Sequence, residues 1–484
     1  MLQPETHRPI HGTAQLPLCV DLDGTLVKSD TLVDSLLVML RTRPAMLLQL
    51  PGVLVHGKAA FKKHISASIT LDVAHLPYNR ALLHFLQHES AQGRAIYLAT
   101  GADARLAHGV ADHLGIFAGV LGSDGETNLT GHNKLDRLRD QMHSGAFDYI
   151  GNARPDLPLL AHATVPMVAN PSLGLRLGMR ARGIHPANEF IERSHLLKSF
   201  FKAIRMHQWA KNLLIFLPLL LSHRLTASNE FSAALAFFCF SLTASATYIV
   251  NDLLDIEADR RHPRKRRRPF ASGDLSVFEG LGIVIVFLLL ALAGGRYLST
   301  EFYGWLLLYL VSTLAYSLYF KRVALVDVMV LSGLYTLRLL AGSAATLTPI
   351  SHWLAGFSIF LFLSLAFVKR FAELENLRAS GASPRNGRGY LVADIEQLRS
   401  FGTASAFAAV VVFANYISGR DVTALYHQPR MLWMIMPMII LWLCRVWLLA
   451  SRGELNEDPV VFALTDRTSL LIGAAVLIIA LLAR

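Results

Sequence analysis

The chain has 484 residues, of which 53% are hydrophobic and 17% are charged. In soluble domains about a quarter of the residues are charged, so this composition excludes an ordinary soluble protein and indicates a membrane protein. The net charge of +11 is explained by basic loops beside an anionic lipid surface, and no nucleic-acid partner is expected.

Residues 1–172 are predicted to form a soluble α/β domain in the cytosol, because the N-terminus lacks the basic-then-apolar layout of a signal peptide. Short apolar runs alternate with helical stretches, which predicts a doubly wound, Rossmann-like parallel sheet. The predicted strands lie in LPLCVDLDG, AIYLATGAD, FAGVLGSDG, FDYIGNARPD and ATVPMVANP. The helical pattern of residues 30–85 predicts a cap inserted after the first strand, and residues 173–195 are predicted to be a basic linker.

Residues 196–484 are strongly apolar and are predicted to form an all-α transmembrane domain. Nine segments are each close to the ~20 residues that a bilayer core requires. The predicted spans are residues 198–221, 229–250, 277–297, 302–320, 324–345, 352–371, 400–418, 430–450 and 467–483. Lys and Arg are concentrated after the second, fourth and sixth spans, so these loops and the soluble domain are expected on the cytoplasmic side of the inner membrane.

Two carboxylates, Asp21 and Asp23, follow the first predicted strand in the segment CVDLDGTLVKSD. Open α/β sheets bind ligands at the carboxyl ends of their strands, and two acids at such a turn can divide phosphoryl transfer between a nucleophile and a general acid/base. A divalent cation would neutralise the acids and the phosphate together. The alternative interpretation is a strand end and a turn without catalytic function.

Residues 16–170 resemble the haloacid dehalogenase superfamily, whose members are mostly phosphatases. The first motif of that superfamily matches the segment DLDGT at residues 21–25. The resemblance implies that Asp21 is a nucleophile that forms an aspartyl-phosphate and that Asp23 is the general acid/base, both beside a bound Mg²⁺. A non-catalytic relic of the same fold is the alternative.

Three further segments, AIYLAT, GHNKLDRL and GNARPD, follow in the order that the superfamily requires. The resemblance implies that Thr100 binds phosphate, that Lys134 steadies the transferred phosphoryl group and that Asp156 is a late magnesium ligand. Asn152 stands where the superfamily often has another acid. Its carbonyl oxygen can still bind Mg²⁺, but with one negative charge fewer the metal is expected to bind more weakly.

An acidic stretch, NDLLDIEAD, occupies residues 251–259 at the end of the second predicted span. On a helix its polar members lie along one side: Asn251, Asp252, Asp255 and Asp259. Carboxylates about 5–6 Å apart repel one another by roughly 3 kcal/mol per pair at an effective dielectric constant near 20. Magnesium bound to a diphosphate would supply the cation that the cluster requires.

A basic run, RRHPRKRRRP, follows the acids directly. Arg260, Lys265 and Arg268 are placed to bind the remaining phosphate oxygens, and His262 lies within the same motif. A topology signal or a lipid-surface patch would account for the bases alone, but it would not account for the acids in front of them.

Residues 196–484 resemble the UbiA superfamily of intramembrane prenyltransferases, because the pattern NDxxDxxxD is unbroken at 251–259 and nine predicted spans fit its fold. The second Asp-rich motif of typical members is replaced by VKRFAELENLR at 368–378. Together with four other segments, this one resembles the decaprenyl-phosphate phosphoribosyltransferase branch. Those segments are RMHQWAKN, DRRHPRKRRRPFASG, YSLYFKR and LRLLAGSAA, with Met206 in place of an expected proline. Members of that branch transfer ribose 5-phosphate from phosphoribosyl diphosphate to a polyprenyl monophosphate.

Two substrates that both carry phosphate require several cations besides a metal site. The candidate cations at predicted helix ends or inside a span are Lys211, Lys321, Arg338, Lys369 and Arg370, and Tyr316 is a further substrate-binding candidate. Arg338 is the most informative, because a charge inside a span costs ~2.5–3.5 kcal/mol even on insertion scales. Topology can also explain the other bases, Tyr316 can be an interface anchor, and Arg338 could snorkel or pair with Asp327, eleven residues earlier.

The resemblance of the membrane domain, together with the adjacency of the phosphatase-like domain, predicts two consecutive reactions on the cytoplasmic side. The acidic stretch would hold Mg²⁺ on phosphoribosyl diphosphate while the anionic oxygen of a polyprenyl phosphate attacks C1. The soluble domain would then remove the 5-phosphate, with its apolar cap helices around 33–56 resting on membrane lipids. Two alternatives stay open: a UbiA-type aromatic prenyltransferase that uses polyprenyl diphosphate and carries an accessory phosphatase, and a non-enzymatic membrane scaffold. The missing second Asp motif argues against the first.

Overall fold

The computed structural model describes residues 15–142, 145–192, 196–222, 225–381, 388–455 and 458–484. The chain forms two compact units. The first consists of residues 1–203 and 250–281, and the second of residues 204–249 and 282–484. The loop after the sixth predicted span, with its predicted surplus of bases, lies partly outside the described residues.

The first unit contains a six-stranded parallel sheet with the strand order β3-β2-β1-β4-β5-β6. Its strands are β1 (Leu18–Val20), β2 (Ile96–Asp103), β3 (Gly119–Ser123), β4 (Asp148–Gly151), β5 (Pro166–Ala169) and β6 (Asn188–Phe190). The strand order reverses between β1 and β4, and open sheets bind ligands at such a switch point. The Rossmann-like parallel sheet expected from the sequence is confirmed.

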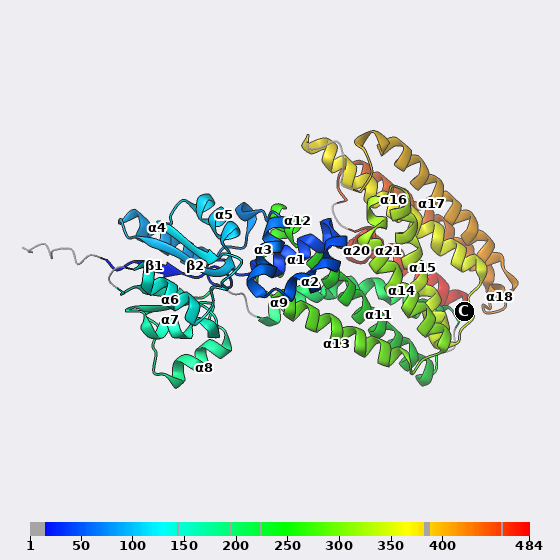
Figure 1. Ribbon diagram of the computed structural model, residues 1–484. Coiled ribbons are helices and arrows are strands. Elements are labelled where there is room, and N and C mark those ends of the chain that lie inside the picture. The colour runs from blue at the N-terminus through cyan, green and yellow to red at the C-terminus, as the bar shows by residue number, and fades with distance from the viewer. Residues whose placement is uncertain (1–14, 143–144, 193–195, 223–224, 382–387, 456–457) are drawn as a thin grey trace, which may run out of the picture. The chain divides into compact units, whose positions relative to one another are not determined.

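Each face of the sheet has its own hydrophobic core, because successive residues of a strand point to opposite faces. Leu18 and Val20 pack with α4 and α5, whereas Cys19 packs with α6, α7 and α8. The helices are α4 (Arg80–Ala91), α5 (Ala104–Leu114), α6 (His132–Gln141), α7 (Leu157–His162) and α8 (Leu173–Ala181). Helices therefore cover both faces (Figure 1), as a parallel sheet requires.

The segment 173–195, predicted from the sequence to be a linker, contains the helix α8 and the strand β6. Leu175 and Met179 of α8 are buried against the sheet, and β6 pairs in parallel with β5. The bases of this segment alternate with those apolar residues along α8. The structure thus places α8 and β6 in the sheet domain, because one helical face is apolar although the average composition is basic.

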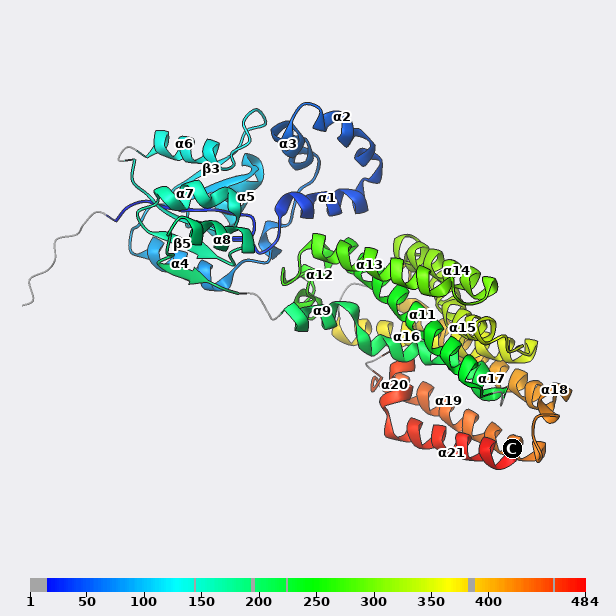
Figure 2. The same cartoon turned by 90° about the horizontal axis from the view of Figure 1, so that it is seen from below.

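A helical cap lies between β1 and β2, in agreement with the pattern of residues 30–85. Its elements are α1 (Thr31–Thr42), η1 (Pro44–Gln49), α2 (Leu50–Leu54), α3 (Lys58–Ser68) and η2 (Val73–His75). Asp30 caps α1, because its side chain accepts hydrogen bonds from the backbone N–H groups of Leu32 and Val33. Met39 and Ile65 form part of a small core within the cap, and Figure 2 shows α1, α2 and α3 grouped together.

The remaining elements are helical, which confirms the all-α class of the membrane domain. They are α9 (Leu196–Ile204), η4 (Met206–Phe216), α10 (Leu217–Leu221), α11 (Ala227–Leu254), α12 (Ile256–Arg261), η5 (Lys265–Arg267), α13 (Val277–Gly295), α14 (Thr300–Leu318), η6 (Phe320–Arg322), α15 (Val326–Thr346), α16 (His352–Ser380), η7 (Val392–Asp394), α17 (Ile395–Ser418), α18 (Arg420–Thr423), η8 (Pro429–Met434), α19 (Ile435–Ser451), α20 (Pro459–Thr465) and α21 (Arg467–Ala483).

Six helices among the described residues are long and apolar enough to cross a membrane. They are Ala227–Leu254, Val277–Gly295, Val326–Thr346, His352–Ala379, Val392–Ser418 and Pro429–Ser451. The count becomes seven if Pro459–Thr465 and Arg467–Ala483, which are bent by 77° relative to each other, form one span. The protein is therefore an integral multi-pass membrane protein, but the expected count of nine spans is not confirmed.

Two of the nine predicted spans are missing in the described part of the chain even when the bent pair is counted as the seventh span. The first, 198–221, is broken into α9, η4 and α10, and Arg205 between the first two adopts a left-handed backbone with φ 52°. Lys211 and Asn212 are buried in η4 with polar partners, an arrangement that a hydropathy count does not detect. The fourth, 302–320, corresponds to the 19-residue helix α14, which is not among the six because Tyr, Ser and Thr residues lower its hydropathy.

Helix α15 and segment η4 approach each other at backbone distance. A Cβ atom added at Gly342 of α15 would lie 2.1 Å from the carbonyl oxygen of Ile215. Small residues allow such close helix contacts in membrane domains. Gly342 is thus required for the packing that carries Arg338 of α15 and Lys211 of η4.

We expect Gly342→Ala to lower the stability of the membrane domain, because the added methyl group must push apart two backbones. Overpacking typically costs about 1–3 kcal/mol, and each kcal/mol lowers Tm by roughly 2–4 °C in a domain of this size. The measurement is the apparent Tm of the purified protein in detergent micelles. Gly333→Ala in the same helix is the control, because a Cβ there meets no atom within 4 Å, and its Tm should be unchanged or higher.

Candidate functional site

A cavity of about 390 Å³ lies at the switch point of the sheet. It brings together side chains from the ends of β1 and β4 and from α6: Asp21, Asp23, Lys134, Asn152 and Asp156. The sequence places these residues in three segments that are far apart, and the parallel strands carry them to the same edge. The predicted constellation is therefore assembled, with the exception of Thr100.

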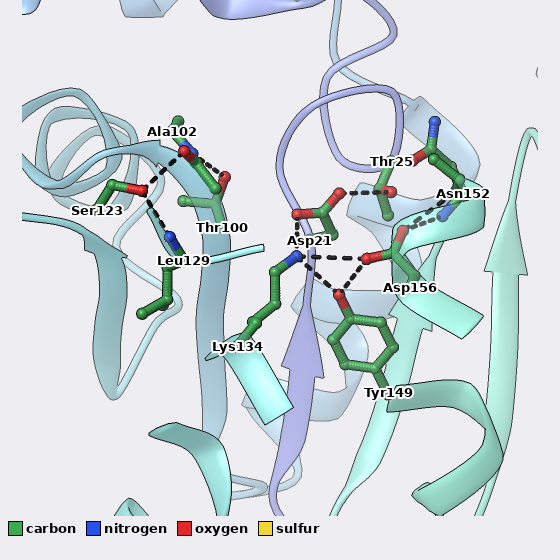
Figure 3. Close-up of polar contacts among 12 residues, drawn as sticks. Asp21, Thr25, Thr100, Ala102, Ser123, Leu129, Lys134, Tyr149, Asn152 and Asp156 are labelled. Carbon is green, nitrogen blue, oxygen red and sulfur yellow. Dashed lines mark hydrogen bonds and ion pairs between the residues drawn. The ribbon is translucent and has the colours of Figure 1, made fainter. Parts of the chain in front are cut away.

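Asp21 follows β1 directly, and Lys134 reaches it from α6 with an Nζ–Oδ1 distance of 2.8 Å. The other oxygen, Oδ2, accepts a long hydrogen bond of 3.4 Å from the hydroxyl of Thr25. Gly24 makes the turn possible, because it adopts φ 73° and a Cβ there would lie 2.0 Å from Nδ2 of Asn152. Figure 3 shows Asp21 between Lys134 and Thr25.

Lys134 is 3% exposed and forms the centre of a buried polar network. Its Nζ atom donates to the hydroxyl of Tyr149 at 3.0 Å and to Oδ1 of Asp156 at 3.3 Å (Figure 3). Burial opposes its charge, but Asp21 and Asp156 more than compensate and hold the pKa of Lys134 above its ordinary value. A permanently charged lysine beside Asp21 fits the stabilisation of a transferred phosphoryl group.

Tyr149 is a member of this network that the sequence interpretation missed. Its hydroxyl donates a 2.8 Å hydrogen bond to Oδ1 of Asp156, so it links the carboxylate to Lys134. The strand FDYIGN contained a signal for this position. Tyr149 lies two residues before Gly151 at the end of β4, so both belong to the same face of the sheet. A buried tyrosine hydroxyl usually has a hydrogen-bonding partner, and the carboxyl end of β4 offers one.

Asp23 lies on the cap side of the cavity. Its Oδ1 atom accepts a 2.8 Å hydrogen bond from the backbone N–H of Thr31, the first residue of α1. Burial, reinforced by the negative charge of Asp30, raises the pKa of Asp23 to about 7. A carboxyl group that holds a proton near neutral pH is suited to protonate a leaving oxygen.

Thr100 lies inside β2, which continues beyond it to Asp103. Its hydroxyl accepts a 3.0 Å hydrogen bond from the backbone N–H of Ala102, and the neighbouring Gly101 lines the cavity instead. The sequence interpretation ended the strand at Thr100, so the structure differs there. Phosphate binding by Thr100 stays a prediction.

The donor atoms near Asp21 fit a hard cation such as Mg²⁺, which prefers oxygen ligands. Oδ2 of Asp21 accepts a long hydrogen bond from Thr25, whereas Oδ2 of Asp156 accepts 3.1 Å hydrogen bonds from the N–H groups of Asn152 and Ala153. Within the described ranges, no three His, Cys, Asp or Glu side chains form a metal-binding group. A metal here would thus depend on the carbonyl oxygen of Asn152 as well as on acids.

The acidic stretch lies at the end of α11 and in α12, and the helix breaks at Asp255. Oδ1 of Asp252 and Oδ2 of Asp259 both contact Nη1 of Arg268, at 2.9 and 2.6 Å. The guanidinium group stands between two buried carboxylates, which shows that this pair fits a shared cation. Asp255 contacts Nη1 of Arg41 at 3.2 Å instead, so the three acids are not gathered around one point.

The predicted phosphate-binding bases of this stretch have different environments. Arg260 is buried, and its Nη1 and Nη2 atoms contact Oδ2 of Asp34 at 2.8 Å and the hydroxyl of Ser29 at 3.1 Å. The ring of His262 accepts hydrogen bonds from backbone N–H groups that follow it, including that of Lys265 at 3.3 Å. The structure therefore gives Arg260 a carboxylate partner within the first unit, whereas Arg268 contacts Asp252 and Asp259 of the acidic stretch.

In the second unit, Lys211 and Lys369 converge on one carboxylate oxygen. Their Nζ atoms lie 2.9 and 2.8 Å from Oδ2 of Asp458, and Tyr335 donates to its other oxygen at 3.4 Å. The sequence interpretation missed Asp458, which precedes α20. No sequence signal identifies it, because it lies 247 and 89 positions from its two partners.

Arg338 is buried in α15 without the partner considered for it. Its Nε atom donates to Oδ1 of Asn212 at 2.7 Å and its Nη2 atom to the hydroxyl of Tyr309 at 2.9 Å. The guanidinium group also lies over the rings of Tyr309 and Tyr335, at 4.8 and 5.5 Å from their centroids. Asp327 pairs with Arg370 instead, at 2.5 Å, so the pairing with Arg338 that the sequence left open is not the one in the structure.

Arg370 is fully buried and holds Glu373, the acid that stands where a second Asp-rich motif was sought. Nη1 of Arg370 contacts both oxygens of Glu373, at 2.7 and 2.6 Å, and Arg388 lies 3.7 Å from it. Tyr316 accepts hydrogen bonds from the same two arginines, at 3.2 and 3.1 Å. Lys321 lies in η6. The charge of Glu373 is already compensated by arginine, which does not suit a metal ligand.

Residues 213–469 match the model of the UbiA prenyltransferase family. The chain is 38% identical to the uncharacterized protein y4nM of Sinorhizobium fredii over 467 residues, which cover 96% of this chain and 90% of that one. It is 33% identical over 275 residues to the nodulation protein NoeC of Azorhizobium caulinodans, covering 56% and 89%. It is 34% identical over 233 residues to the decaprenyl-phosphate phosphoribosyltransferase of Mycobacterium tuberculosis, covering 47% and 76%.

We expect Tyr149→Phe to lower the rate of phosphate-ester hydrolysis, because Lys134 and Asp156 lose the hydroxyl that joins them. The loss of one buried hydrogen bond to charged groups is worth about 1.5 kcal/mol, which corresponds to roughly tenfold in kcat. The measurement is steady-state hydrolysis of p-nitrophenyl phosphate by the full-length protein. Tyr97→Phe on β2 is the control, and an equal rate in both variants would contradict a role for the Tyr149 hydroxyl.

Proposed function

Because the chain belongs to the UbiA prenyltransferase family, we propose that its membrane domain transfers 5-phosphoribosyl from phosphoribosyl diphosphate to a polyprenyl phosphate. The similarity to a decaprenyl-phosphate phosphoribosyltransferase supports this choice of substrates. The observation that carries it is the surplus of cations around Asp458. The Lys- and Arg-rich loops support a cytoplasmic position for the reaction at the inner membrane.

Lys211, Lys369 and Arg338 of the second unit carry more positive charge than the carboxylate of Asp458 neutralises. Lys211 and Lys369 share the single carboxylate of Asp458, and the hydrogen-bonding partners of Arg338 in the described chain are all uncharged. Unpaired charges are costly within a membrane domain. A phosphate dianion would neutralise them, and the acceptor lipid carries one.

The donor diphosphate is assigned to the acidic stretch. Asp252 and Asp259 already share the Arg268 guanidinium, so they are placed to hold Mg²⁺, and Asn251 and Asp255 are proposed as its further ligands. Magnesium, when bound, neutralises the departing diphosphate. Arg268 would then contact the diphosphate oxygens.

The transfer breaks the bond between C1 of the ribose and the diphosphate oxygen and forms a bond between C1 and an oxygen of the polyprenyl phosphate. The bonding electrons leave with the diphosphate. The attacking oxygen is already anionic, so the step needs no general base. Lys211, Lys369 and Arg338 would orient the acceptor phosphate, and Lys265 is proposed to contact the donor from its exposed position in η5.

The alternative of a UbiA-type aromatic prenyltransferase is less well supported by the contacts of Glu373. Such an enzyme would use acids after the sixth span to hold a second metal on a prenyl diphosphate. Glu373 is instead paired with Arg370 and Arg388. A neutral aromatic acceptor would also give the cations around Asp458 no anion to bind.

The N-terminal domain is proposed to hydrolyse the 5-phosphate of the transfer product, giving polyprenyl-phosphoryl ribose. A carboxylate oxygen of Asp21 attacks phosphorus, the bond to O5 of the ribose breaks, and O5 takes the proton of Asp23. Water then hydrolyses the aspartyl-phosphate, Asp23 takes back a proton from this water, and inorganic phosphate is released. The contact of Lys134 with Asp21 and the raised pKa of Asp23 support these roles. Mg²⁺ would be held by the carboxylates of Asp21 and Asp156 and by carbonyl oxygens of Asn152 and Asp23, and it would neutralise the phosphoryl oxygens.

The lining of the phosphatase cavity supports a lipid-linked substrate. Besides its polar floor, the cavity has an apolar wall that includes Phe270 and Phe278 from the segment that follows the acidic stretch. The enzyme that makes the intermediate and the one that hydrolyses it are on one chain, and this tether raises the local concentration of the intermediate.

We expect the double variant Asp252→Asn with Asp255→Asn to lose at least about 100-fold in transfer, because the remaining charge is too small to hold the metal on the diphosphate. The measurement uses phosphoribosyl diphosphate with ¹⁴C in its ribose and follows the transfer of this label to polyprenyl phosphate in reconstituted vesicles. Glu257→Gln is the matched control, because this acid belongs to the same acidic stretch, lies in α12 and pairs with Arg261 at the surface. Undiminished transfer by the double variant would refute the assignment, and dependence on an aromatic acceptor would favour the alternative.

The sequence of transfer followed by removal of the 5-phosphate is tested with phosphoribosyl diphosphate that carries ³²P in its 5-phosphate. The intact protein should release the label as inorganic phosphate after transfer, whereas Asp21→Asn should leave it on the lipid because no nucleophile attacks phosphorus. Asp112→Asn, an exposed acid of α5, should behave as the intact protein. Equal release by Asp21→Asn would show that this domain does not act on the lipid, and label that never reaches lipid would refute the transfer.

A further inference from the structure

Lys62 of the cap reaches the rim of the sheet domain. Its Nζ atom donates to the carbonyl oxygen of Gly101, at 2.5 Å, and to Oδ1 of Asn128, at 2.8 Å. Both acceptors are uncharged. Within the described ranges no carboxylate lies at ion-pair distance from this ammonium group, so its charge is left without a direct counter-ion.

The position of Lys62 is that of a ligand-binding group. It lines the cavity of about 390 Å³ together with Asp21 and Asp23. It also lines a smaller cavity of about 70 Å³, where Asp23 and Asp30 are its neighbours. Burial lowers the pKa of Lys62, although Asp23 and Asp30 oppose the shift. A partly desolvated cation gains from an anion that enters the cavity.

Lys62 and Lys134 lie beside different acids of the cavity, Lys134 beside Asp21 and Lys62 beside Asp23. Lys134 contacts Asp21 and Asp156, so it lies with the nucleophile and the transferred phosphoryl group. Lys62 lies with Asp23, the proposed acid that protonates the leaving oxygen. The part of the substrate that extends past Asp23 towards Lys62 is thus the leaving group, and a lysine there selects a leaving group that is itself an anion.

We propose that Lys62 binds a second phosphate on the leaving-group side, which makes the N-terminal domain selective for phosphomonoesters that carry a further phosphate group. This inference rests on the proposed function, in which the leaving group is a ribose whose C1 bears a phosphodiester. Lys62 is then a specificity-determining residue of the cap, and its bonds to Gly101 and Asn128 hold it at the mouth of the cavity when no substrate is bound.

The test compares two soluble substrates with the full-length protein in detergent. One is ribose 5-phosphate, and the other is the methyl phosphodiester at C1 of ribose 1,5-bisphosphate, which adds only the second anion. The measured quantity is kcat/KM for release of the 5-phosphate. The intact protein should prefer the second substrate, and Lys62→Gln should reduce that preference by about tenfold, the loss of one charge-assisted contact.

Two further variants make the result specific. Lys62→Arg keeps the charge and should retain most of the preference. Lys63→Gln removes the neighbouring, exposed lysine of α3 and should leave both values of kcat/KM within about threefold of the intact protein.

The outcomes separate the inference from the function on which it rests. An intact protein that hydrolyses both substrates without preference, or a Lys62→Gln variant that loses both activities in parallel, overturns the inference while the phosphatase assignment stands. An intact protein that releases phosphate from neither substrate, while Lys62→Gln is equally inactive, overturns the assignment itself.

Discussion

Burying a charge without a counter-ion is costly, and this constraint governs the placement of charged side chains in both units. Lys134 is buried because Asp21 and Asp156 surround it. Arg370 is buried because Asp327 and Glu373 neutralise it. Each ion pair fixes the relative positions of side chains that come from distant segments of the chain. The positions of Asp21, Lys134 and Arg370 thus follow from charge compensation as much as from the path of the backbone.

Much of the first unit could be predicted because its signals are local. The apolar runs and the turn residues after them indicate the strands, and the segment DLDGT places two acids at the end of the first. Tyr149 and Lys62 were not found, since their roles arise from contacts with segments 7 and 39 positions away. The linker was misplaced because composition was averaged over α8, whose apolar face is visible only when periodicity is considered.

The membrane domain was predictable in class but less so in detail. Hydropathy identifies helices such as α15, yet it treats a segment like η4 as a span although Lys211 and Asn212 interrupt it. Arg338 was correctly singled out as a charge within a helix, whereas its partners Asn212 and Tyr309 lie 126 and 29 positions away. Asp458 could not be inferred at all. Apolar periodicity is encoded locally, but the pairing of buried charges is decided by the packing of helices.

The guanidinium group of Arg268 lies between Asp252 and Asp259, in the place that the proposed reaction gives to a divalent ion. In the proposed reaction the incoming divalent ion displaces the arginine, and the displaced arginine becomes available to the diphosphate that accompanies the metal. The divalent ion would then bind where two carboxylates lie, and the diphosphate would bind where a free guanidinium group lies. Binding of the metal together with the donor is therefore expected to be more favourable than binding of either alone. The resting protein also avoids electrostatic repulsion at a helix end without requiring stored magnesium.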